Sequence, residues 1–154
     1  SVSAFYFGNL PQALHGTADA VLFIRALHNM ARFSETKDFL GSAIENAFQA
    51  LKPGGIVGIV QHAAPADMPT TWANGARGYL HETFVIEQMQ AAGFEFVGSS
   101  DINANARDVP GADDVVWRLP PVLNGSKDNA ELAATMSEIG ESNRMTLKFR
   151  KPSA

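Results

Sequence analysis

Cysteine is absent from all 154 residues of the sequence. This excludes disulfide bonds, thiolate metal sites and cysteine nucleophiles, and it leaves the compartment open. No apolar run approaches the ~20 residues that a membrane-spanning helix needs, so we expect no membrane contact. The chain starts at Ser1 without a charged stretch followed by an apolar one. We therefore expect no remaining signal peptide, a cytoplasmic protein by default, and a processed or truncated product.

Charge is also scarce, with 18% charged residues and a formal net charge of -4. A negative chain is a poor partner for the phosphates of nucleic acid, so we expect no nucleic-acid binding. With 45% apolar residues the composition is that of an ordinary globular protein. The length predicts a single domain over residues 1–154 that can bury its own core.

The strongest pattern lies between Asp38 and Val60. Apolar side chains recur there at helical spacing up to Leu51, and Lys52-Pro-Gly-Gly55 follows as a helix stop. The unbroken apolar run Ile56–Val60 is typical of a strand covered on both faces. A similar run, Ala20–Ile24, lies upstream. Strand, helix and strand predict a right-handed βαβ unit with two parallel strands.

The second half of the sequence predicts further helices and strands. A helix over Phe84–Ala92, with Thr83 as N-cap and Gly93 as stop, leads into a strand over Phe94–Val97. Residues 101–142 are broken by Asn, Pro and Gly, and we expect an irregular insertion there. Within this insertion, Asp128–Ile139 predicts one helix with an apolar face.

The last predicted strand is Arg144–Arg150, in which apolar and charged residues alternate. This alternation favours an antiparallel strand with one partly solvated face.

These segments together resemble the C-terminal half of class I S-adenosylmethionine (SAM) dependent methyltransferases. The likeness rests on Asp19–Asn29, Leu-Lys-Pro-Gly-Gly before a strand, the Ala-Ala-Gly-Phe step at Ala91–Phe94 and the ending Leu147–Pro152. Together with His62 after the second strand, this combination looks like a subgroup of predicted bacterial methyltransferases. It implies an α/β, Rossmann-like but partial fold, with strands 4, 5, 6 and antiparallel 7 of the sheet order 3-2-1-4-5-7-6.

The resemblance also implies methyl transfer from SAM to a small-molecule acceptor by the intact protein. The glycine-rich turn and the acidic ribose-binding residue of the family are missing here, so we expect the isolated chain to bind SAM poorly and to be inactive. In the whole fold strand 4 pairs with strand 1. We therefore expect the edge Ala20–Ile24 to be unpaired, and to join a second copy as a homo-oligomer or by strand exchange.

Candidate site residues follow from strand ends, because ligands of open α/β sheets bind outside the carboxyl ends of the strands. His28 and His62 follow two such ends and are candidate general bases, with hydrogen-bonded loop histidines as the equally weighted alternative. The resemblance assigns cofactor contacts to Arg25, Ala26, Leu27 and Asn29. An exposed salt bridge is the alternative for Arg25.

Arg77 and His81 precede the second helix and are candidate acceptor-binding residues on a covering loop. A zinc site formed by His28, His62 and His81 is disfavoured, because no pair has i,i+4 spacing on one helix and no His-Glu-x-x-His motif occurs. Packing is favoured over substrate contact for Trp72 and Trp117.

The acidic cluster Asp108, Asp113 and Asp114 predicts a solvated loop, since it lacks the spacing of a calcium loop. Two other functions remain open. The first is a non-catalytic fragment or interaction module. The second is a histidine-lined metal-dependent α/β enzyme.

Overall fold

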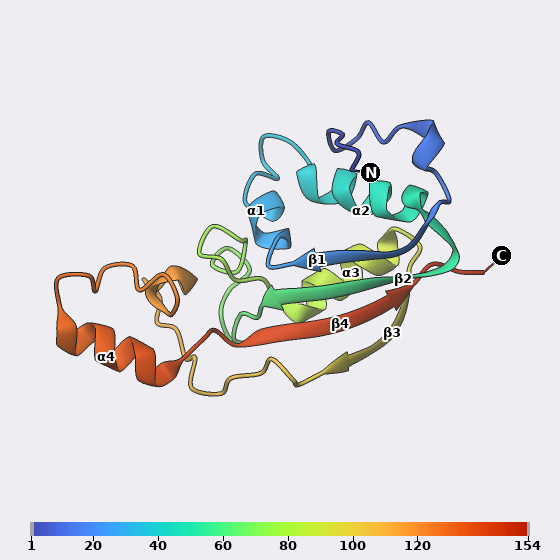
Figure 1. Ribbon diagram of the computed structural model, residues 1–154. Coiled ribbons are helices and arrows are strands. Elements are labelled where there is room, and N and C mark those ends of the chain that lie inside the picture. Colours follow the sequence, from blue (N-terminus) through green and yellow to red (C-terminus); the bar gives the residue numbers. More distant parts are fainter. Residues whose placement is uncertain (1, 154) are drawn as a thin grey trace.

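The computed structural model describes residues 2–153 and contains one four-stranded sheet with the order β1-β2-β4-β3 (Figure 1). β1 (Ala18–Ile24) runs parallel to β2 (Leu51–His62), and β4 (Arg144–Arg150) runs antiparallel to both β2 and β3 (Glu95–Ser100). The bounds of β4, its direction and the order of the strands confirm the sequence-based prediction. β1 forms one edge of this sheet and β3 the other.

Three helices pack on one face of the sheet: α1 (Leu27–Ala31), α2 (Phe39–Ala50) and α3 (Glu82–Ala91). α2 begins where the Asp38 side chain accepts a hydrogen bond from Gly41 N. The predicted glycine stop of this helix is wrong. The chain is already extended at Leu51, and Gly54, with a φ of 78°, belongs to an irregular part of β2 where its pairing with β1 shifts.

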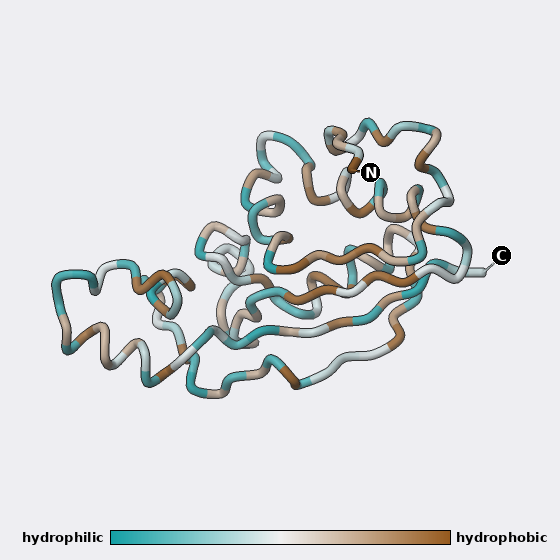
Figure 2. The backbone as a smooth tube through the Cα atoms, in the orientation of Figure 1, coloured by the Kyte–Doolittle hydropathy of each residue, from teal (hydrophilic) through white to brown (hydrophobic). Residues whose placement is uncertain are grey.

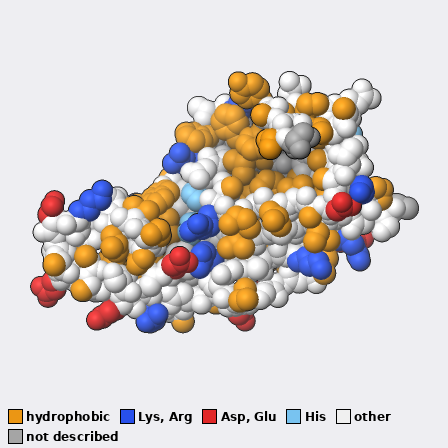
Figure 3. All heavy atoms as spheres, in the orientation of Figure 1, with side chains coloured by type: hydrophobic (Ala, Val, Ile, Leu, Met, Phe, Trp, Pro, Cys, Tyr) orange, Lys and Arg blue, Asp and Glu red, His pale blue; other side chains and the backbone are white. Residues whose placement is uncertain are grey.

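The core lies between these helices and the inner face of the sheet. Val57 and Ile59 of β2 and Leu147 of β4 point into it and are buried, as the alternation in the final strand predicted. The prediction that the run Ile56–Val60 is covered on both faces is wrong. On the opposite face Leu22 is 66% exposed, Ile24 51% and Ile56 38%. Brown segments mark β1 and β2 as apolar strands in Figure 2, and Figure 3 shows apolar side chains gathered on the surface in front of the sheet.

The insertion extends from the body as an arm that carries α4 (Ala130–Ile139) (Figure 1). This helix was predicted, and the Asn129 side chain caps it by accepting from Leu132 N. None of its residues is buried, so its apolar face does not join the core. In α3 the predicted cap at Thr83 is wrong, since the helix begins two residues earlier than predicted, at Glu82, with His81 as the N-cap residue. Gly93 has the positive φ of 94° expected just beyond a helix end.

A buried ionic group ties the insertion to the body. Asp108 pairs with Arg118 at 2.8 Å, and the Tyr79 hydroxyl donates to both Asp108 carboxylate oxygens at 3.0 Å. The Asp108 carboxylate also accepts from Asn143 N, just ahead of β4. The solvated loop predicted around Asp108 is therefore wrong for this residue. The group fixes the turn Val116–Arg118 over the sheet end where the polar residues of the candidate site gather.

Among residues 2–153, no helix is long and apolar enough to cross a membrane.

Candidate functional site

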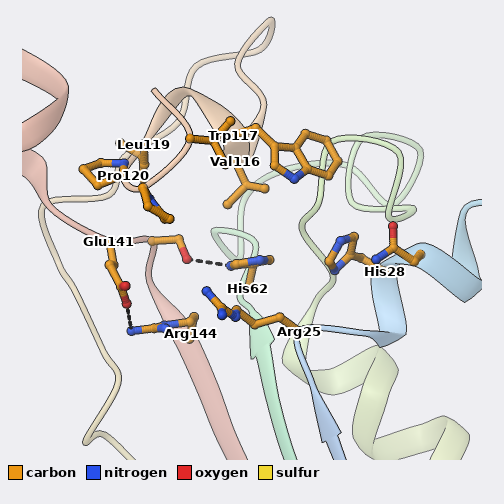
Figure 4. Close-up of a pocket in the computed structure, with 13 residues that line it drawn as sticks. Arg25, His28, His62, Val116, Trp117, Leu119, Pro120, Glu141 and Arg144 are labelled. Carbon is orange, nitrogen blue, oxygen red and sulfur yellow. Dashed lines mark hydrogen bonds and ion pairs between the residues drawn. The ribbon is translucent and has the colours of Figure 1, made fainter. Parts of the chain in front are cut away.

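A pocket of about 220 Å³ lies at the carboxyl ends of β1 and β2 and the start of β4 (Figure 4). Its polar lining consists of Arg25, His28, Asn29, His62, Glu141, Ser142 and Arg144. Its apolar wall comes from the insertion, as Val116, Trp117, Leu119, Pro120, Pro121 and Val122. Histidine and cationic side chains meet where the arm joins the body (Figure 3). Ligand sites of open α/β sheets occupy this same end.

His62 ends β2 and stands in the middle of the pocket. Its Nδ1 lies 2.6 Å from Ser142 Oγ, and its ring centroid lies 5.3 Å from that of His28. Burial, reinforced by the proximity of the titratable His28 and by the positive charges of Arg144 and Arg25, lowers the pKa of His62 to about 3. The ring is therefore neutral at pH 7. The tautomer whose Nδ1–H donates to Ser142 leaves a lone pair on Nε2, which points toward the His28 side of the pocket (Figure 4).

His28 is held by a buried glutamine whose hydrogen bonds fix the tautomer of the histidine. Gln61 Nε2 donates to the carbonyl of Gly78 at 2.9 Å, so the other amide atom, Oε1, is the acceptor that faces His28. This oxygen lies 3.1 Å from His28 Nδ1 and 3.3 Å from His28 N. Nδ1 must therefore carry the proton, and Nε2 carries the lone pair. Burial lowers the pKa of His28, so a second neutral imidazole lines the pocket.

Two guanidinium groups reach the pocket from β1 and β4, the two strands that flank β2. Arg25 directly follows β1, has the unusual φ of 52° for a non-glycine residue, and donates its backbone N–H to Val60 O. Arg144 starts β4 and lies directly opposite His62 in the strand register. It pairs with Glu141 at 2.5 Å through one terminal nitrogen. Figure 4 shows Arg25 extending toward His62, and Arg144 with its guanidinium turned toward Glu141.

The structure brings together four of the residues predicted from strand ends, namely Arg25, His28, Asn29 and His62. Two of the predicted cofactor contacts lie elsewhere, because Leu27 is buried in the core and Ala26 packs against it. The salt bridge considered for Arg25 is not found among residues 2–153.

The two candidate acceptor-binding residues lie outside the pocket. The Arg77 guanidinium lies over the Trp72 ring, 5.9 Å from its centroid. His81 Nε2 donates to Met68 O at 2.9 Å and lines a separate cavity of about 290 Å³. Trp72 is buried, as predicted, whereas Trp117 forms part of the pocket wall.

The three histidines of the disfavoured zinc site are therefore not assembled. Within residues 2–153, no group of three or more histidine, aspartate or glutamate side chains is arranged to hold a metal ion. His28 and His62 are adjacent, but Arg25 and Arg144 line the same pocket. Cationic neighbours oppose the binding of a metal cation.

Comparison with known proteins identifies the fold. No protein-family profile and no curated protein matches the sequence. Among solved structures, the chain is similar to the cyclase SpnF, with 22% identity, a TM-score of 0.62 and coverage of 99% of this chain and 56% of that one. It is also similar to a chain in the complex of the Haloferax volcanii Trm112 methyltransferase activator with its assigned methyltransferase, with 16% identity, a TM-score of 0.56 and coverage of 96% and 59%.

A third similar structure is a SAM-dependent methyltransferase of Methanosarcina mazei, with 11% identity, a TM-score of 0.53 and coverage of 91% of this chain and 62% of that one. The chain therefore spans less than two-thirds of each of these three neighbours. At these identities the comparisons establish an α/β, Rossmann-like fold of the kind found in class I methyltransferases. Because one neighbour is a cyclase, the function must be argued from the site.

The residues of this pocket do not fit SAM by themselves. SAM carries a sulfonium cation, whereas the pocket presents Arg25 and Arg144, and its one carboxylate, Glu141, is engaged by Arg144. The ribose hydroxyls have no free acidic partner here. A volume of about 220 Å³ also falls below the ~300 Å³ at which sites for ligands of this size begin. The pocket suits a smaller and negatively charged molecule.

Proposed function

We propose that this chain forms the acceptor-binding side of a SAM-dependent methyl-transfer site in the intact protein. In this proposal SAM is held mainly by residues outside the present sequence. His62 takes a proton from the acceptor hydroxyl or amine through Nε2, and its hydrogen bond with Ser142 holds the ring in place. His28, fixed by Gln61, lies beside it as a second neutral acceptor of a hydrogen bond.

One observation carries the proposal. His28 and His62, at the carboxyl ends of two adjacent parallel strands, lie with ring centroids 5.3 Å apart in one pocket. His28 is buried and His62 half-buried, and each is oriented by a side-chain hydrogen bond. Neutral, oriented imidazoles are suited to proton removal, which is the task left to a protein whose methyl donor is already reactive.

The test is methyl transfer by the protein as its full reading frame encodes it. Isotopically labelled SAM is mixed with a small-molecule extract of the source cells, to which 3-hydroxybenzoate, 3-hydroxybenzamide and phenol are added. We expect a labelled small-molecule product. His62→Gln should lower kcat/KM by about 10²-fold or more, as the removal of a general base does. His15→Gln, at an exposed histidine outside the pocket, is the matched control. No labelled product, or equal activity of both variants, would refute the proposal.

An interaction module is the second candidate, and the exposed edge of the sheet favours it. β1 pairs only with β2 within the described residues, so the backbone groups on its other side are free to pair. Edge strands of stable monomers usually carry Lys, Pro or a covering element. β1 has one charged residue, Asp19 at its start, and otherwise presents Leu22 and Ile24 to solvent.

The occupant that we propose for this edge is a second copy of the chain. Two copies of β1 related by a twofold axis would pair antiparallel and keep their apolar side chains on one continuous face. Light scattering at high concentration should then give a dimer mass, and Leu22→Lys should give a monomer. Val97→Lys, on β3 at the opposite edge, should leave the dimer intact. A monomeric parent chain would count against this second candidate.

A further inference from the structure

We infer that the ligand of this pocket is a small cyclic or aromatic carboxylate, bound through Arg25 and Arg144 with its ring against the apolar wall. The inference rests on the proposed function only in treating this ligand as the acceptor.

The first support is an unsatisfied donor. Arg144 Nε is buried, yet it has no hydrogen-bond partner among residues 2–153. A buried N–H without a partner is costly, and native structures rarely retain one without a ligand or water to accept from it. Glu141 occupies only a terminal nitrogen of the same guanidinium and is itself half-exposed. The second terminal nitrogen of Arg144 has no partner among residues 2–153 and is not buried, and Arg144 is among the residues that line the pocket.

The second support is the position of Arg25. Its side chain has no hydrogen bond or ion pair within the described residues, although it lines a pocket that already holds a second guanidinium. Its backbone is held in the left-handed region, which costs a residue with a Cβ about 1 kcal/mol. Strain retained at a residue whose side chain enters a pocket is typical of binding sites. Two guanidiniums facing one space attract an anion, and their planar forks match the two oxygens of a carboxylate.

The third support is the wall opposite the arginines. Val116, Trp117, Leu119 and Pro120 present apolar and aromatic surface over the same space (Figure 4). A cavity of about 150 Å³ can hold benzene, so about 220 Å³ admits one ring with a carboxylate and another small substituent. Inorganic phosphate would satisfy the arginines but leave this wall without contact. The two arginines on one side and the apolar wall on the other together favour an organic acid.

The anion would also activate the base. His62 is kept from protonation partly by the charges of Arg144 and Arg25. A carboxylate between these arginines offsets their field and moves the pKa of His62 upward, toward the range in which a general base works at neutral pH. Ligand binding and proton removal are thus coupled through the same two arginines.

The experiment is a binding titration of the purified chain with benzoate, followed by NMR through the Trp117 indole and His62 ring signals. Benzamide, which has the same shape without the charge, and inorganic phosphate are titrated in parallel. We expect benzoate to bind at least tenfold more tightly than either. Arg25→Gln and Arg144→Gln should each weaken benzoate at least tenfold, because each removes charge-assisted hydrogen bonds.

Arg150→Gln is the matched control, since it changes the charge equally at the far end of β4 and should leave binding unchanged. If Arg144→Gln does not fold, the more exposed Arg25 carries the test. Equal binding of benzamide and benzoate, equal binding of phosphate, or an equal loss in Arg150→Gln would overturn the inference.

The outcome is separable from that of the proposed function. Benzoate binding without any methyl transfer would leave the ligand class in place and refute methyl transfer. Equal methylation of phenol, 3-hydroxybenzamide and 3-hydroxybenzoate would overturn the carboxylate inference and keep the function.

Discussion

His62 Nδ1 and Ser142 Oγ are 2.6 Å apart, and this contact joins the end of β2 to the residue two places ahead of β4. Ser142 has no other side-chain hydrogen bond among the described residues, so its hydroxyl is committed to the imidazole. We predict that Ser142→Ala lowers kcat of methyl transfer by about 10- to 100-fold, because the ring is no longer held in one orientation. KM for a carboxylate acceptor should not change, since the arginines remain.

Rescue distinguishes orientation of the ring from general stability. Ser142→Thr keeps the hydroxyl and should recover most of kcat. Both variants should unfold in urea within about 1 kcal/mol of the parent, the usual value of one hydrogen bond. A loss of activity that follows stability instead of the hydroxyl would contradict this role of Ser142.

The lowered pKa of His62 predicts an acid-sensitive fold. In the unfolded chain the ring binds a proton near pH 6.5, whereas in the folded chain it does so only near pH 3. Between these values the unfolded state binds more protons, so the free energy of unfolding decreases as the pH falls through this window. His28, Arg25 and Arg144 surround the ring and all oppose its protonation; Glu141, the one acid in the pocket, is paired with Arg144.

The measurement is urea unfolding at several pH values between 6.5 and 3. His62→Gln should reduce the pH slope by up to about 1.4 kcal/mol per pH unit, the value of one proton. His15→Gln should follow the parent curve. If His62→Gln and the parent have the same slope, the ring is not held neutral by the fold.

Much of the site was predictable once strand order was assumed. An antiparallel strand beside β2 must start where β2 ends, so Arg144 had to lie opposite His62. The register of the two strands confirms this pairing. The sequence prediction placed both residues correctly at strand ends without drawing this consequence. Ser142 follows from the same geometry. The role of Gln61 could not be predicted in this way, because the sequence does not show toward which face of the sheet a polar residue at the end of an apolar strand points.

Other features could not be read from local patterns. An apolar run such as Ile56–Val60 reports what a strand can bury, and not whether an element is present to cover it. Asp108 looked solvated because its partners lie 10 residues away, at Arg118, and 29 residues away, at Tyr79. Only the folding of the insertion over the sheet end brings these three residues together. Irregular segments lack the periodicity on which sequence interpretation depends.

The buried Asp108 group provides a stability prediction. Asp108→Asn removes the nearer of the two carboxylates that pair with Arg118, which would remain largely buried. Breaking one partner of a buried ion pair costs about 3 to 5 kcal/mol, and we expect a loss of that order in urea unfolding. Asp113→Asn, in the same loop but exposed, should change stability by less than about 0.5 kcal/mol. Similar small effects of both variants would show that the Asp108 group does not hold the insertion in place.

Arg25 allows binding and stability to be separated at one residue. Its φ of 52° is unfavourable for any residue with a Cβ and free for glycine, so Arg25→Gly relieves strain while it deletes the guanidinium. We predict that its free energy of unfolding equals that of the parent or exceeds it by up to about 1 kcal/mol, although benzoate affinity falls at least tenfold. Ile24→Gly, one residue earlier in the strand, should lose about 1 kcal/mol and keep its affinity for benzoate. If Arg25→Gly were instead less stable than the parent by a similar amount, the side chain would be supporting the fold, and its strained backbone would no longer argue for a binding role.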